Sequence, residues 1–150
     1  MVVRRRGGAS AVTPALAALA TLVLASVAAT TTACSGIVDP SKNQIQQISG
    51  TIPVQSSSTN PFSTGRTGEF SVKVTSLTPN TGAFFGVILA QGPSDGTCSG
   101  NLPIFQQNSF ATVNTIALSG PIYPGNYCVY VYDIGSFTVP ETYTGQISFP

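Results

Sequence analysis

The side chains with the most distinctive chemistry in this chain are three cysteines, Cys34, Cys98 and Cys128. Disulfides use cysteines in pairs, so at least one of the three thiols needs a different role if the protein is exported. Cys34 directly follows a long apolar run. Cys98 lies in the turn-rich stretch QGPSDGTCSGN, and Cys128 lies in the alternating stretch NYCVYVYD.

The chain offers little acid–base chemistry. It contains no histidine, so every catalytic triad that uses imidazole as its base is excluded. Five carboxylates remain after residue 33, and no pair of them has a placement that indicates glycoside hydrolysis. The sequence also lacks a GxSxG motif and a glycine-rich phosphate loop. We therefore expect no catalytic residue, no metal site, no cofactor and no enzymatic activity.

Charge is scarce as well, because only 7% of the residues are charged. Three of the six basic residues are consecutive arginines at positions 4–6, and no other basic cluster occurs. Nucleic-acid binding depends on neutralising phosphates with Lys and Arg, so the sequence excludes a nucleic-acid partner.

The N-terminus has the pattern of an export signal. The arginines are followed by an apolar run over residues 15–29 and by the small residues TTTA, which end at Ala33. At about 15 residues the run is shorter than the roughly 20 that a membrane-spanning helix needs. We expect residues 1–33 to be a signal peptide that follows the general secretory route.

Two ways of processing remain open at Cys34. An ordinary signal peptidase could cut after Ala33 and release a secreted protein. Alternatively, TTAC resembles the cleavage box of bacterial lipoproteins, with Thr31 at the position where that family prefers leucine. This resemblance implies a diacylglyceryl thioether on Cys34 and a membrane partner at the cell envelope, because stable anchoring needs more than one acyl chain. Residues 34–47 would then be a tether.

With Cys34 lipidated, Cys98 and Cys128 are expected to form a disulfide in the oxidising compartment. The alternative is a thiol pair for redox work or metal binding. The CxxC spacing of such sites is absent, and the chain has no histidine to add as a metal ligand.

Residues 48–150 have the pattern of an all-β domain. EFSVKV (69–74) alternates, with Glu69, Ser71 and Lys73 on one face, and AFFGVILA (83–90) fits a central strand covered on both sides. Further strands are expected over 48–54, 103–105, 110–118, 127–133 and 142–149, with turn signals such as STNP and TPNTG between them. Short strands at this spacing predict an antiparallel β-sandwich of the jelly-roll or immunoglobulin-like kind.

Two tyrosines are candidates for ligand binding. Tyr130 and Tyr132 alternate with Val129 and Val131, so both rings should lie on the outer face, beside the disulfide. Exposed aromatic rings on a sheet can bind sugar rings, and the competing interpretation is packing across neighbouring strands. Asp95 and Asp133 could join backbone carbonyls in a calcium site, or simply stabilise turns.

The C-terminal part resembles the closing strands of pre-peptidase C-terminal-like domains. The similarity rests on the pattern G-x-Y-x-V-x-V followed by Y-x-x-x-[IV]; it falls on Gly125, Tyr127, Val129, Val131, Tyr143 and Ile147, and EFSVKVTSL resembles an earlier strand of the family. AFFGVIL stands where the family has an acidic D-x-D-L segment. The resemblance implies a non-catalytic accessory module.

Taken together, these patterns lead us to expect a lipid-anchored binding or structural module whose partner is a glycan or an envelope protein. The alternative is a carbohydrate-binding module that binds its ligand with Tyr130 and Tyr132.

Overall fold

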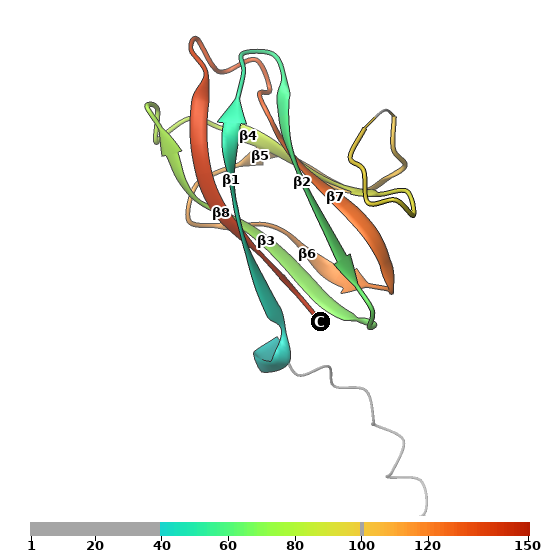
Figure 1. Ribbon diagram of the computed structural model, residues 1–150. Helices are drawn as coiled ribbons and strands as arrows, with labels where there is room; N and C mark the ends of the chain where they lie inside the picture. The colour runs from blue at the N-terminus through green and yellow to red at the C-terminus, as the bar shows by residue number, and fades with distance from the viewer. Residues whose placement is uncertain (1–39, 100) are drawn as a thin grey trace, which may run out of the picture. The chain divides into compact units, whose positions relative to one another are not determined.

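The structure is a computed structural model that describes residues 40–99 and 101–150. One 3-10 turn and eight β-strands occur in these residues, and Figure 1 labels the strands. The turn is Pro40–Lys42, and the strands are β1 (Gln44–Ile52), β2 (Ser57–Thr64), β3 (Gly68–Thr78), β4 (Phe85–Gln91), β5 (Ile104–Ala111), β6 (Ile116–Ile122), β7 (Gly125–Tyr132) and β8 (Glu141–Phe149).

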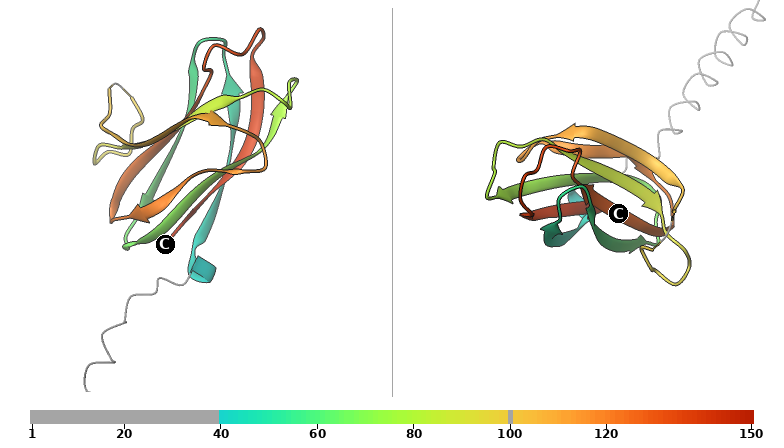
Figure 2. Two further views of the ribbon diagram at one scale, coloured as in Figure 1. Left: turned by 180° about the vertical axis from the view of Figure 1, so that it is seen from behind. Right: turned by 90° about the horizontal axis from the view of Figure 1, so that it is seen from above.

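The strands form two four-stranded antiparallel sheets. One sheet has the order β1-β8-β3-β6 and the other has the order β2-β7-β4-β5. The first four strands therefore pair with the last four in reverse order: β1 with β8, β2 with β7, β3 with β6 and β4 with β5. Figure 2 shows the strands from behind and from above. The predicted all-β antiparallel sandwich is confirmed, and this pairing gives it the jelly-roll arrangement.

The core lies between the sheets and follows from the alternation of the strands. In β3, Phe70, Val72 and Val74 point inward while the side chains between them face outward, as the sequence predicted. Val129 and Val131 of β7 are fully buried on the opposite inner face. Aromatic rings close the end of the core near the C-terminus, where Phe62 lies 5.0 Å from Phe149 and 5.5 Å from Tyr127, measured between centroids.

Three expectations about the strands were wrong. The residues from Gln44 to Gln47, assigned to the tether, pair with β8 as the first half of β1. The STNP stretch, interpreted as a turn, lies within β2, where it pairs with β7. Asn60 in this stretch is buried, and its Nδ2 donates to the Tyr143 hydroxyl at 2.6 Å. The expected strand over 110–118 is the end of β5 and the start of β6, separated by a turn in which Asn114 has a φ of 65°.

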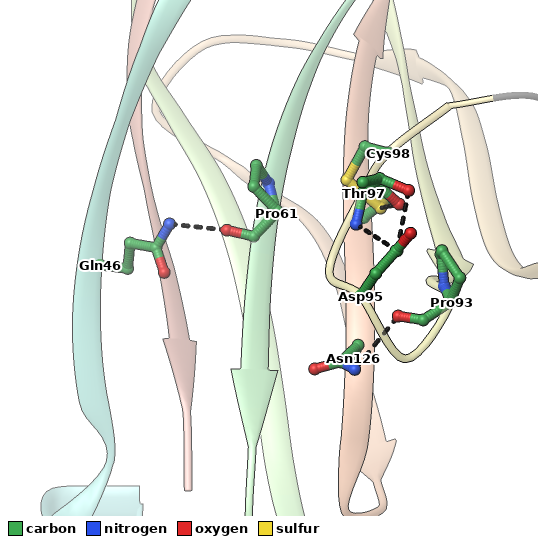
Figure 3. The surroundings of a disulfide bond; sticks show 8 residues. Gln46, Pro61, Pro93, Asp95, Thr97, Cys98 and Asn126 are labelled. Atoms are coloured by element: carbon green, nitrogen blue, oxygen red, sulfur yellow. Dashed lines mark hydrogen bonds between the residues drawn. A yellow bond between two sulfur atoms is a disulfide. The ribbon is translucent and has the colours of Figure 1, made fainter.

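Side-chain amides satisfy carbonyls at the open edges of the sheets. Gln46 of β1 donates to the carbonyl of Pro61 in β2 at 3.0 Å (Figure 3). On the other side, Gln106 and Asn108 of β5 donate to the carbonyls of Ser119 and Ala117 in β6, at 3.1 and 2.9 Å. These bonds link the two sheets and occupy acceptors that another strand could otherwise pair with.

Candidate functional site

The predicted disulfide is present, whereas Cys34 lies outside the described residues. Cys98 and Cys128 are joined with their Cα atoms 5.6 Å apart, a usual separation for a disulfide. The bond attaches the loop between β4 and β5 to the strand β7, and Figure 3 shows its surroundings. In Figure 1 this loop projects beside β7.

Asp95 stabilises a turn in that loop. Its Oδ1 accepts hydrogen bonds from the backbone N–H and the hydroxyl of Thr97, both at 2.9 Å (Figure 3). The backbone bond from Thr97, followed by the hydroxyl bond, lowers the pKa of the exposed Asp95 carboxyl. Asn126 of β7 fastens the same loop by donating to the carbonyl of Pro93 at 3.1 Å.

Asp133 organises the loop at the far end of β7. Its Oδ1 accepts from the backbone N–H groups of Gly135, Ser136 and Phe137 at 2.8–3.1 Å, and its Oδ2 accepts from that of Gln55 at 2.8 Å. The side chain is only 8% exposed. Burial raises the pKa of Asp133, but the four backbone hydrogen bonds outweigh it and leave the pKa below its usual value.

The two aspartates do not form a common site. Asp95 lies in a loop fastened to Asn126, at the start of β7, whereas Asp133 follows the end of that strand. Within residues 40–99 and 101–150, no group of three His, Cys, Asp or Glu side chains is placed to hold a metal ion. For both aspartates the geometry therefore favours the interpretation as turn residues over the calcium alternative.

The two candidate tyrosines project from the outer face of the sheet β2-β7-β4-β5, as expected from the buried valines between them. Tyr132 lies across Gly86 of β4, where an added Cβ would collide with its ring. Its hydroxyl bonds with Gln107 at 2.8 Å and with Ser109 at 3.0 Å. Packing across neighbouring strands therefore accounts for the position of Tyr132.

Tyr130 lies beside a small, largely apolar hollow. The hollow has a volume of about 150 Å³, and its other lining residues are Ile88, Ala90, Asn101, Leu102 and Ile104. The Tyr130 hydroxyl oxygen is buried and has no hydrogen-bond partner in the structure. Tyr130 and Tyr132 thus share a face, but they differ in how far their hydroxyl groups are already engaged.

A larger hollow, of about 370 Å³, lies on the outer face of the other sheet. We call it the serine hollow, because Ser71, Ser119 and Ser148 line it together with Asn43, Glu69, Phe70, Ile116 and Gly120. The register places Ser71 directly opposite Ser119 of β6 on one side and opposite Ser148 of β8 on the other. Sequence reasoning placed Glu69 and Ser71 on the polar face, but it missed the hollow, since alternation does not give the register between strands.

Most of the residues that carry the family resemblance lie in the core of the sandwich. Tyr127, Val129, Val131, Tyr143 and Ile147 are all buried core residues. The Tyr127 hydroxyl donates to the carbonyl of Tyr123 at 2.9 Å, and the Tyr143 hydroxyl donates to Ser58 Oγ at 3.1 Å.

The solved structures that are similar to this chain include that of one mitogen. It is the crystal structure of a mitogen derived from Yersinia pseudotuberculosis, with 15% sequence identity and a TM-score of 0.48, covering 71% of this chain and 84% of that chain. No family model matches this chain, and no curated protein matches it either.

No helix within residues 40–99 and 101–150 has the length and apolar character needed to cross a membrane.

Proposed function

We propose that this protein is a non-enzymatic, exported lipoprotein that presents one β-sandwich as a binding or structural module at the cell envelope. The observation that carries the proposal is the Cys98–Cys128 disulfide. A disulfide is typical of a compartment outside the cytosol, and this one uses two of the three cysteines in the sequence, so Cys34 is the remaining one. Cys34 stands where a signal peptide followed by a lipidated cysteine would place it.

The length of the connection supports the same proposal. Only residues 35–43 separate Cys34 from the first residue of β1, so the tether is shorter than the sequence pattern indicated. A connection of that length would hold the sandwich near the membrane surface. Envelope components such as a glycan or a neighbouring envelope protein are therefore the proposed partners.

The roles of the buried carboxylates support a module without catalysis. Asp133 accepts four backbone hydrogen bonds, and the 1% exposed Glu141 accepts one from the backbone N–H of Asn80 at 2.9 Å. Both side chains thus stabilise loops. General acid–base catalysis needs a titratable group within reach of a substrate, and neither carboxylate is free for that.

The test is the mass of the N-terminal peptide of the mature protein, purified from membranes of a bacterial host that processes lipoproteins. We expect the peptide to begin at Cys34 and to carry a diacylglyceryl group. Cys34→Ser is the matched control, and it should leave the membrane fraction. A mature chain that begins at an unmodified Cys34 would contradict the anchor and support secretion.

A second candidate function is carbohydrate binding through Tyr130 and Tyr132. It is favoured by the position of both rings, partly exposed, on one outer sheet face. Tyr130→Ala/Tyr132→Ala should then lose binding to insoluble polysaccharides in a pull-down assay. The control is Tyr123→Ala, because Tyr123 is 56% exposed in the turn between β6 and β7. Equal pull-down of the unmodified protein, the double variant and Tyr123→Ala would exclude this role for the tyrosine pair.

A further inference from the structure

We propose that the serine hollow is a binding site for one ring of a neutral saccharide. The site lies on the opposite outer face from Tyr130 and Tyr132, so it shares only the ligand class with the second candidate function. The hollow is formed by short side chains in register. Ser148, Ser71 and Ser119 form a row across β8, β3 and β6, next to the longer side chains of Gln146, Lys73 and Ile116 in the following row.

The polar groups of the hollow are only partly engaged. Asn43 Nδ2 donates to the backbone carbonyl of Glu69 at 2.8 Å and to Ser148 Oγ at 3.1 Å. Within the described part of the chain, no side chain or backbone group bonds the Glu69 carboxylate or the hydroxyl groups of Ser71 and Ser119. A carboxylate and two hydroxyl groups are therefore free to exchange hydrogen bonds with a ligand.

The spacing and chemistry of these groups favour a sugar. Neighbouring strands are about 4.8 Å apart, so hydroxyl groups in one row can contact different hydroxyl groups of one ring. A carboxylate forms strong, charge-assisted hydrogen bonds with hydroxyl donors. Ile116, which is 62% exposed, supplies an apolar surface for the C–H groups of the ring. Among the described residues that line the hollow there is no Lys or Arg, and the charge of Glu69 would repel anionic ligands.

The size of the hollow agrees with this ligand class. Its volume of about 370 Å³ lies at the lower end of the range for small-molecule sites. One ring of an oligosaccharide would occupy it, while the neighbouring rings would extend over the polar sheet face. Asn43 immediately precedes β1, so the hollow lies at the end of the sandwich that leads toward the tether.

The experiment is a titration of the isotope-labelled mature chain, followed by NMR of its backbone amides, in detergent micelles if the chain carries lipid. The probes are maltotriose, cellotriose and N-acetylated chitotriose. We expect at least one of them to give saturable shifts centred on the amides of Ser71, Ser119 and Ser148. Glu69→Gln should weaken that binding by about tenfold or more, since a neutral amide oxygen then replaces the charged acceptor and the hydrogen bond loses its charge assistance.

A second pair of variants tests the location. Ser119→Phe fills the hollow and should abolish the shifts, whereas Ser49→Phe, on the exposed face of β1 in the same sheet, should bind like the unmodified chain. The proposal is overturned if no probe gives a saturable shift, if the shifts centre on Tyr130 and Tyr132, or if Glu69→Gln binds as tightly as the unmodified chain. The mass of the N-terminal peptide tests the anchor independently of this result.

Discussion

Asp133 illustrates how this protein uses its few charged residues. By residue type it was a candidate calcium ligand, but both carboxylate oxygens accept hydrogen bonds from backbone N–H groups. One of these donors is Gln55, 78 positions earlier in the sequence, so the side chain connects two loops. A buried carboxylate is tolerated because several donors compensate for its lost hydration.

Replacing Asp133 should weaken the fold and alter its response to acid. Asp133→Asn keeps one acceptor oxygen but cannot accept from Gln55 and the other loop at once, so we expect a loss of about 1–3 kcal/mol in unfolding free energy. Because the folded pKa lies below its usual value of 3.8, the carboxylate stabilises the fold fully above about pH 4. That contribution disappears as the pH falls through the lowered pKa.

The measurement is urea unfolding at neutral pH and at several acidic values. The loss caused by Asp133→Asn should shrink as the pH falls below about 4, since the unmodified carboxyl then also loses its charge. Asp95→Asn is the matched control, because Asp95 bonds only to Thr97 in an exposed turn. It should change stability by no more than about 0.5 kcal/mol. Equal losses from the two variants would contradict the structural role of Asp133.

At the level of elements, the pairing of β4 with β7 gives Tyr132 its position. The register places Gly86 directly opposite Tyr132, and the ring covers the space above the glycine. A glycine in a strand is usually unfavourable, and a ring packed over it from the neighbouring strand compensates for the missing side chain. The glycine and the tyrosine therefore act as one structural unit.

Gly86→Ala should destabilise the protein by about 1–3 kcal/mol, because the new methyl group overlaps the Tyr132 ring. Urea unfolding of Gly86→Ala, Tyr132→Ala and the double variant measures the coupling between the two positions. We expect Gly86→Ala to cost far less once the ring is absent. Gly82→Ala is the control, since nothing lies within 4 Å of its added methyl group. Strict additivity of the two changes would show that the ring does not depend on this glycine.

At the level of the whole molecule, the disulfide joins positions 30 residues apart. It connects a loop to a central strand, so the two sheets would form without it. Its main effect is expected in the unfolded chain, where it removes conformations that an open loop could adopt. For a domain of this size the effect is a large part of the total stability.

Cys98→Ser/Cys128→Ser should lower the unfolding free energy by about 3–4 kcal/mol while leaving the far-ultraviolet circular dichroism of the sheets unchanged. Chemical reduction of the unmodified protein should give a loss of similar size. Loss of the β-sheet spectrum on reduction alone would contradict this account, because it would mean that the sheets themselves need the bond.

Much of the fold could be predicted because it depends on local patterns. The alternation of Phe70, Val72 and Val74 with polar residues identifies β3 and its inner face wherever the strand pairs. The long apolar run of β4 predicted a central strand, and β4 does lie between β7 and β5. The disulfide was predictable too, since three cysteines leave only Cys98 and Cys128 once Cys34 is assigned to the proposed lipid anchor.

The sequence by itself therefore determined most of the strands, their inner faces and the disulfide, because each follows from neighbouring residues or from a simple count. It did not find β2, which lies where a turn was expected. Only the tertiary structure decided the jelly-roll pairing and the buried position of Asn60 within β2. It alone brought Ser71, Ser119 and Ser148 into one row from three strands. The physical reason is that register depends on how whole sheets pack, and residues far apart in sequence become neighbours only after that packing is complete.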